Sequence, residues 1–102
     1  KIGTAQDYTY IGNLKFKDGK IDEAEVNFDK AVDYFKEANN TQGLLQLFMT
    51  VARMELIVSR KDQSEKYLDQ AKIICKDLGD PEAIVKAIEE IEKVKDSVDV
   101  NR

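Results

Sequence analysis

The residues that could carry out chemistry are few, and their types exclude most enzyme mechanisms. The chain has 102 residues, no histidine and a single cysteine, Cys75. A serine or cysteine nucleophile usually needs a neighbouring base, and neither a Ser-His-Asp nor a Cys-His arrangement can be built without histidine. The five glycines stand apart from one another, so the sequence contains no glycine-rich phosphate loop. We therefore expect a protein that is not an enzyme.

The remaining reactive groups are better explained by helix stability than by catalysis or metal binding. The pair Asp22/Glu23 stands at a predicted helix start, where negative charge is favourable, and Glu89/Glu90 lies on a predicted solvent face. Cys75 falls on an apolar stripe, which indicates a buried structural thiol, with a redox role as the alternative. A single cysteine excludes an internal disulfide and argues against an ordinary zinc site. We expect no metal and no cofactor.

Composition and charge narrow the class of partner. Apolar residues make up 42% and charged residues 35% of the chain, which is typical of a helical globular protein. The net charge is −4 and the 16 Lys and Arg residues are dispersed, so nucleic acid and anionic membranes are not expected partners. The most apolar stretch, 44–58, contains Arg53 and Glu55, which predicts no membrane insertion. A fragment of a longer protein is expected, because the chain begins with Lys1 and not Met. The expected location is cytoplasmic, since no signal peptide or membrane span is visible in the sequence.

The spacing of apolar residues predicts five helices and no strands, so the fold class is all-α. The predicted helices cover about 4–18, 22–38, 41–59, 62–79 and 81–97. Gly19, Asn39-Asn40 and Gly79 are the predicted stops, since these residues tolerate the conformations found at helix ends. Capping boxes are expected at Asp22/Glu25 and Asp62/Glu65, and Asp80-Pro81 is expected to be an N-cap followed by a proline at the first helical position.

A sequence block recurs after forty residues, which is typical of stacked helical repeats. Large apolar residues match apolar residues, and small residues match small ones. Small side chains at the matched positions would allow the two helices of each pair to approach closely, while the large ones fill the surrounding space. The matched pairs are Tyr8/Phe48, Ile11/Val51, Gly12/Ala52, Ala24/Ser64, Phe28/Leu68 and Ala31/Ala71.

These residues resemble the tetratricopeptide repeat (TPR), in the variety with a forty-residue period. The departures are Lys15 and Glu55 at positions where the family usually has an aromatic residue. The resemblance implies a right-handed α-α superhelix in one domain, 1–102, with hairpins at about 4–39 and 41–79 and a capping helix at about 81–97. Projecting the repeat forward places Glu92 where Gly12 and Ala52 stand, which suits a terminal helix with a polar face.

The resemblance also implies where function lies, because the first helix of each TPR hairpin lines a concave groove. We expect a scaffold that binds a peptide or helix of a partner protein. The alternatives are a self-assembling homo-oligomer, or a peptide-sensing fragment of a larger regulator. For each residue, packing or simple solvation is an open alternative to binding. The expected groove residues are Thr9, Tyr10, Asn13, Lys17, Met49, Thr50, Arg53, Ile57 and Lys86, and the wider set adds Gln6, Phe16, Gln46, Glu90 and Lys93.

Overall fold

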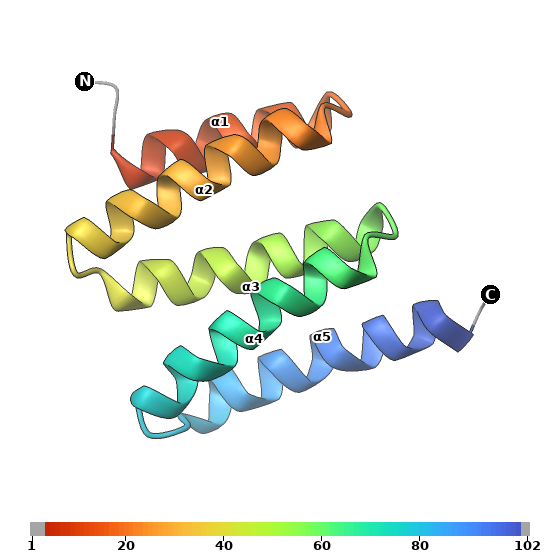
Figure 1. Ribbon diagram of the computed structural model, residues 1–102. Coiled ribbons are helices and arrows are strands. Elements are labelled where there is room, and N and C mark those ends of the chain that lie inside the picture. The colour runs from red at the N-terminus through yellow and green to blue at the C-terminus, as the bar shows by residue number, and fades with distance from the viewer. Residues whose placement is uncertain (1–3, 101–102) are drawn as a thin grey trace. The chain divides into compact units, whose positions relative to one another are not determined.

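The computed structural model describes the backbone of residues 4–100 and the side chains of residues 4–96, and in it the chain forms five helices (Figure 1). No residue from 4 to 100 belongs to a strand, which confirms the all-α class. Within the same range, no helix is long and apolar enough to cross a membrane. The helices are α1 (Ala5–Lys17), α2 (Ile21–Glu37), α3 (Thr41–Ile57), α4 (Lys61–Asp77) and α5 (Glu82–Val100).

The first four helices end in the same way, at positions spaced twenty residues apart. The residue after each C-cap has a positive φ: Gly19, Asn39, Ser59 and Gly79, with φ of 78°, 54°, 60° and 87°. The amide of this positive-φ residue and the amide of the residue after it both donate to carbonyls near the end of the helix. The amide nitrogen of Lys20, for example, lies 2.9 Å from the carbonyl oxygen of Lys15. This pair of bonds satisfies carbonyls that the helix leaves free. The predicted stops at Gly19, Asn39 and Gly79 are confirmed.

The two predicted capping boxes are wrong. The N-cap of α2 is Lys20 and that of α4 is Arg60, and neither makes a side-chain cap hydrogen bond. Asp22 and Asp62 instead lie within the first turn of their helices. The geometry of the turn explains why the N-caps are Lys20 and Arg60. In both of these turns the second residue after the C-cap donates its amide to the preceding helix and is also the N-cap of the next one. A three-residue connection therefore fixes the position of the N-cap, whichever residue could cap best.

The start of α5 also differs from the prediction. Asp80 has a φ of +53°, outside the extended region that an N-cap residue adopts. The helix begins one residue later than predicted, at Glu82, and the carbonyl of Pro81 accepts from the amide of Val85 at 3.0 Å. At its other end α5 continues to Val100, three residues beyond the predicted end.

Side-chain caps are present at two other helix starts. Thr4 accepts a hydrogen bond from the amide of Asp7 at 3.1 Å, and the carboxylate of Asp7 accepts one from the amide of Thr4 at 3.3 Å. This capping box satisfies amides at the start of α1. At the start of α3, the Oδ1 of Asn40 accepts from the amide of Gly43 at 2.9 Å.

The chain divides into two compact units, residues 1–47 and 48–102. In the first unit α1 and α2 form an antiparallel pair, and Gly12 lies against the buried ring of Phe28. A Cβ atom at Gly12 would lie 2.6 Å from the Cε1 of Phe28. The same holds for Gly43, near the start of α3, where an added Cβ atom would lie 2.5 Å from the Cε1 of Phe35. Glycine permits both approaches, because any other residue would require the ring to move.

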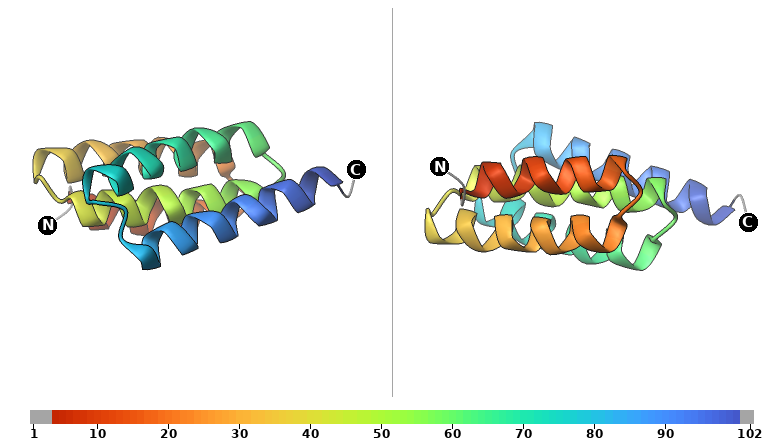
Figure 2. Two further views of the ribbon diagram at one scale, coloured as in Figure 1. Left: turned by 90° about the horizontal axis from the view of Figure 1, so that it is seen from below. Right: turned by 90° about the horizontal axis from the view of Figure 1, so that it is seen from above.

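The second unit contains the C-terminal part of α3 with α4 and α5 (Figure 2). The buried hydroxyl of Ser64 donates to the carbonyl of Ala52 at 2.8 Å, which joins α4 to α3. Two ion pairs join α4 to α5: Lys72 with Glu92, and Glu65 with Lys95 at 3.7 Å. Glu92 therefore faces α4 in this structure.

Candidate functional site

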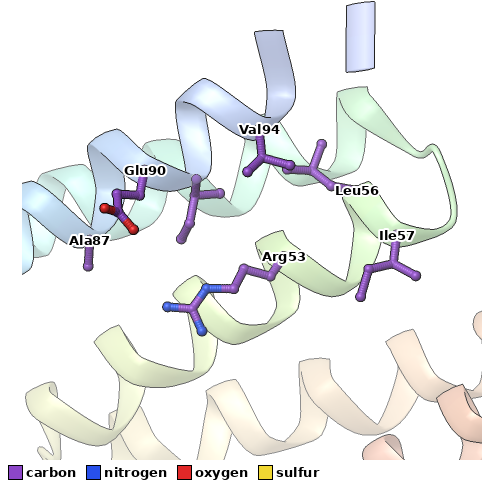
Figure 3. Close-up of a pocket in the computed structure, with 7 residues that line it drawn as sticks. Arg53, Leu56, Ile57, Ala87, Glu90 and Val94 are labelled. Atoms are coloured by element: carbon purple, nitrogen blue, oxygen red, sulfur yellow. The ribbon is translucent and has the colours of Figure 1, made fainter. Parts of the chain in front are cut away.

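A cleft of about 440 Å³ lies between the C-terminal part of α3 and α5, entirely within the second unit (Figure 3). Its volume is within the range of sites that hold small molecules or side chains of a partner, about 300 to 1,000 Å³. Three residues of α3 and four of α5 line it. They are Arg53, Leu56, Ile57, Ala87, Glu90, Ile91 and Val94.

The lining of the cleft is mainly aliphatic. Leu56 and Ile91 are buried beneath it, whereas Ile57 is 74% exposed and Val94 is 53% exposed. Single exposed apolar side chains are ordinary on a protein surface, but a contiguous group beside a concavity is typical of an interaction site. The helical spacing explains the grouping, because residues three and four apart lie on one face of a helix.

Two charged side chains, Arg53 and Glu90, border the cleft from opposite helices. Figure 3 shows both toward the end of the cleft nearer Ala87, with Leu56 and Val94 toward the other end. Within the described part of the chain, neither Arg53 nor Glu90 makes a hydrogen bond or an ion pair. The guanidinium therefore keeps its donors available for a carboxylate, which it can bind through two parallel hydrogen bonds.

Of the predicted groove residues in the second unit, the cleft includes Arg53 and Ile57. Lys86 is exposed and forms an ion pair with Glu82 at 3.2 Å, one turn earlier on α5. Met49 and Thr50 are half-buried and lie outside the lining.

The other predicted groove residues lie on α1 in the first unit, where their surroundings differ. The hydroxyl of Thr9 donates to the carbonyl of Ala5 at 2.8 Å, so its own helix uses the donor. Tyr10 and Lys17 are exposed. The Oδ1 of Asn13 is buried and has no hydrogen-bond partner among the described residues. These four side chains line none of the second unit's cleft.

The sequence prediction omitted the four apolar lining residues other than Ile57. Ala87, Ile91 and Val94 belong to the apolar stripe of α5, and Leu56 belongs to the apolar stretch of α3, so all four looked like core residues. A stripe shows which face of a helix is apolar but not how far a neighbouring helix covers it. Glu90 belongs to the wider set of expected groove residues, and the lining includes it.

Reactive groups elsewhere in the second unit do not contribute to the cleft. Cys75 is buried in α4; burial, and then the carboxylate of Asp80, raise the pKa of its thiol above the ordinary value of 9.0. A protonated, buried thiol is a poor nucleophile. Among the side chains described, no three His, Cys, Asp or Glu residues converge as metal ligands. The cleft itself offers apolar contact, one cation and one anion.

Comparisons with protein-family models, with curated proteins and with solved structures found no match to this chain.

Proposed function

We propose that this chain is a protein-interaction module that binds a peptide or helix of a partner protein in the cleft between α3 and α5. The observation that carries the proposal is the exposure of Ile57 and Val94 beside that cleft. Transferring apolar surface from water into a contact is favourable, by roughly 25 cal/mol per Å². A partner that covers these side chains therefore gains free energy that the isolated chain leaves unused.

The architecture that we propose is the TPR one: two helical hairpins and a capping helix, stacked as a right-handed superhelix. Three features support it. Helices α2, α3 and α4 each have 17 residues. Their ends recur every twenty residues. The paired positions Gly12/Ala52 and Ala24/Ser64, forty residues apart, are all buried. In this arrangement Thr9, Tyr10, Asn13 and Lys17 would extend the binding surface along α1.

Binding without chemistry is the role that suits the lining. Among the lining residues whose side chains are described there is no serine, threonine, cysteine or lysine nucleophile, and the carboxylate of Glu90 has no acidic neighbour. Acid–base catalysis generally requires a group whose pKa is close to the working pH and which lies within reach of a reacting proton. We therefore propose a scaffold whose activity is recognition.

Selection of random 16-residue peptides on the whole chain, by display, tests the proposal. We expect enriched peptides whose affinity falls at least tenfold for Ile57→Asp and for Val94→Asp. The chain supplies matched controls: Ile73 is 62% exposed on α4 and Val26 is 54% exposed on α2, and neither lines the cleft. Ile73→Asp and Val26→Asp should bind the same peptides as the unmodified chain does.

Two results would contradict the proposal. One is a set of peptides that bind equally well to Ile57→Asp, since these would occupy another surface. The other is a self-associated state, detected by light scattering over a range of concentrations, that Ile57→Asp converts to monomer. In that case the cleft serves the self-assembling alternative. Circular dichroism of each variant would establish that the helices are retained.

A further inference from the structure

We infer that the occupant of this cleft is a short amphipathic α-helix of a partner protein, docked with an acidic residue against Arg53. The inference rests on the proposed function and goes further, because it excludes an extended peptide and assigns the charge pattern of the partner.

The shortage of polar groups in the cleft argues against an extended peptide. Each residue of an extended peptide brings one backbone donor and one acceptor. Arg53 and Glu90 are the polar side chains among the described residues of the lining. Apart from Ile57, the last residue of α3, these positions lie inside helices, whose backbone groups bond internally. Each buried backbone group left without a partner weakens binding, because the group gives up its hydrogen bonds to water. A helical peptide avoids this cost because its backbone hydrogen bonds are made within itself.

The spacing of the lining residues sets the size of the docked helix. On α5 they run from Ala87 to Val94, a spacing of i, i+3, i+4 and i+7. This distance is about 10 Å along the helix, or two turns. A partner helix of about three or four turns can cover it with apolar residues at the same spacing, the usual pattern of a helix bound in a groove.

The charges at the rim specify the two edges of the partner helix. Arg53 on the α3 side favours an acidic residue, and Glu90 on the α5 side disfavours one and favours a base. Lys86 changes this balance little, because Glu82 already pairs with it. The net charge of −4 makes a strongly acidic partner a poor match, so one acidic residue facing Arg53 is the expected feature. Rim charges of this kind set register and orientation more than affinity.

The same peptide selection, read for sequence pattern, tests the inference. Enriched peptides should carry apolar residues at helical spacing with an acidic residue beside them. Arg53→Glu should weaken these peptides at least tenfold, and replacing their acidic residue by lysine should restore binding to Arg53→Glu. Lys76→Glu is the matched control, since Lys76 is exposed on α4 outside the lining, and it should leave affinity within about twofold.

A proline in the middle of a selected peptide distinguishes the two bound conformations. Proline disrupts the interior of a helix, so a loss of affinity of tenfold or more is expected. If proline is tolerated while Ile57→Asp still abolishes binding, the occupant is extended and the inference fails, although the proposed function stands. If Arg53→Glu has no effect, the acidic residue is wrongly assigned. If Ile57→Asp has no effect either, the proposed function fails too.

Discussion

In the first unit α1 approaches α2 where Gly12 meets the ring of Phe28, whereas in the second unit α3 meets α4 where Ser64 donates to the carbonyl of Ala52. The positions match at a forty-residue spacing, yet the contacts differ in kind. Ala24 stands where Ser64 does, and Leu68, fully buried, stands where Phe28 does. The two regions therefore maintain a close approach of two helices with different residues.

The difference shows that side-chain volume is balanced within each contact. The larger ring of Phe28 is accompanied by a glycine, and the smaller Leu68 by an alanine at position 52. Because protein interiors are close-packed, one added carbon has to be offset by a neighbour. The repeat thus preserves the total volume of a contact, while the residue types are free to change in pairs.

The largest effect on the free energy of unfolding is expected when Gly12 and Phe28 of the first unit are replaced by the residue types of the second unit, alanine and leucine. Gly12→Ala should lower the free energy of unfolding by about 1 to 3 kcal/mol, because the new Cβ meets Phe28 at 2.6 Å. Phe28→Leu should cost about 1 kcal/mol through lost burial. In the double variant the two costs should be less than additive by about 1 kcal/mol, since leucine makes room for the methyl group. Urea unfolding measures all three.

The opposite substitution in the second unit is the control for this cycle. Ala52→Gly removes a buried methyl group and should cost about 2 kcal/mol, from the lower helix propensity of glycine and the lost apolar burial. An increase in stability on Gly12→Ala would contradict the volume balance, because it would mean that helix propensity outweighs the contact with Phe28.

The sequence predicted five helices and most of their ends, because those features depend on local signals. Apolar spacing marks a helix, and Gly19 and Gly79 adopt left-handed backbone angles at low cost. The capping boxes failed because the N-caps Lys20 and Arg60 are determined by the preceding turn. Gly43 was treated as an isolated glycine, and its approach to Phe35 depends on how two helices pack.

The cleft was only partly predictable for the same reason. Arg53 and Ile57 were expected because the resemblance implies that the first helix of each hairpin lines the groove. Ile91 and Val94 lie on one apolar stripe of α5, yet Ile91 is buried and Val94 is 53% exposed. The stripe alone does not separate them, since burial depends on where α3 ends beside α5.

The next largest effect on the free energy of unfolding is expected from removing the hydroxyl of Ser64. This change makes the contact between α3 and α4 resemble the contact between α1 and α2. Ser64→Ala reproduces the residue type of Ala24 and loses the hydrogen bond to Ala52. We expect a loss of about 1 kcal/mol in the free energy of unfolding. Thr9→Ala is the control, because that hydroxyl bonds within its own helix and should be neutral or stabilising on removal. Equal losses in the two variants would contradict a special role for a bond between helices.

The turns allow a finer comparison between the units. Ser59 holds a φ of +60° at the position where Gly19 and Gly79 stand in other turns. Ser59→Gly should raise the free energy of unfolding by about 0.5 to 1 kcal/mol by relieving backbone strain. Gly19→Ala should lower it by about 1 kcal/mol, from strain alone, since no atom lies within 4 Å of the added Cβ. A loss on Ser59→Gly would show that the serine side chain stabilises its turn.

The smallest effect is expected from the ion pairs at the surface. Lys72→Met, which removes the pair with Glu92, should cost no more than about 1 kcal/mol near neutral pH, since both side chains are partly exposed. The hydrogen bond to Glu92 raises the pKa of Lys72 above 10.5, so the contribution of the ion pair to stability is complete below pH 10.5 and lost as pH rises through the raised value.

In the first unit the Nζ of Lys15 lies 3.3 Å from the Oε1 of Glu23, and Glu23 is 57% exposed, so Lys15→Met should cost less than Lys72→Met. Unfolding at several pH values and at about 1 M salt, where the Debye length is about 3 Å, measures both. A cost of Lys72→Met that persists at high salt would assign its role to packing of the aliphatic stem rather than to charge.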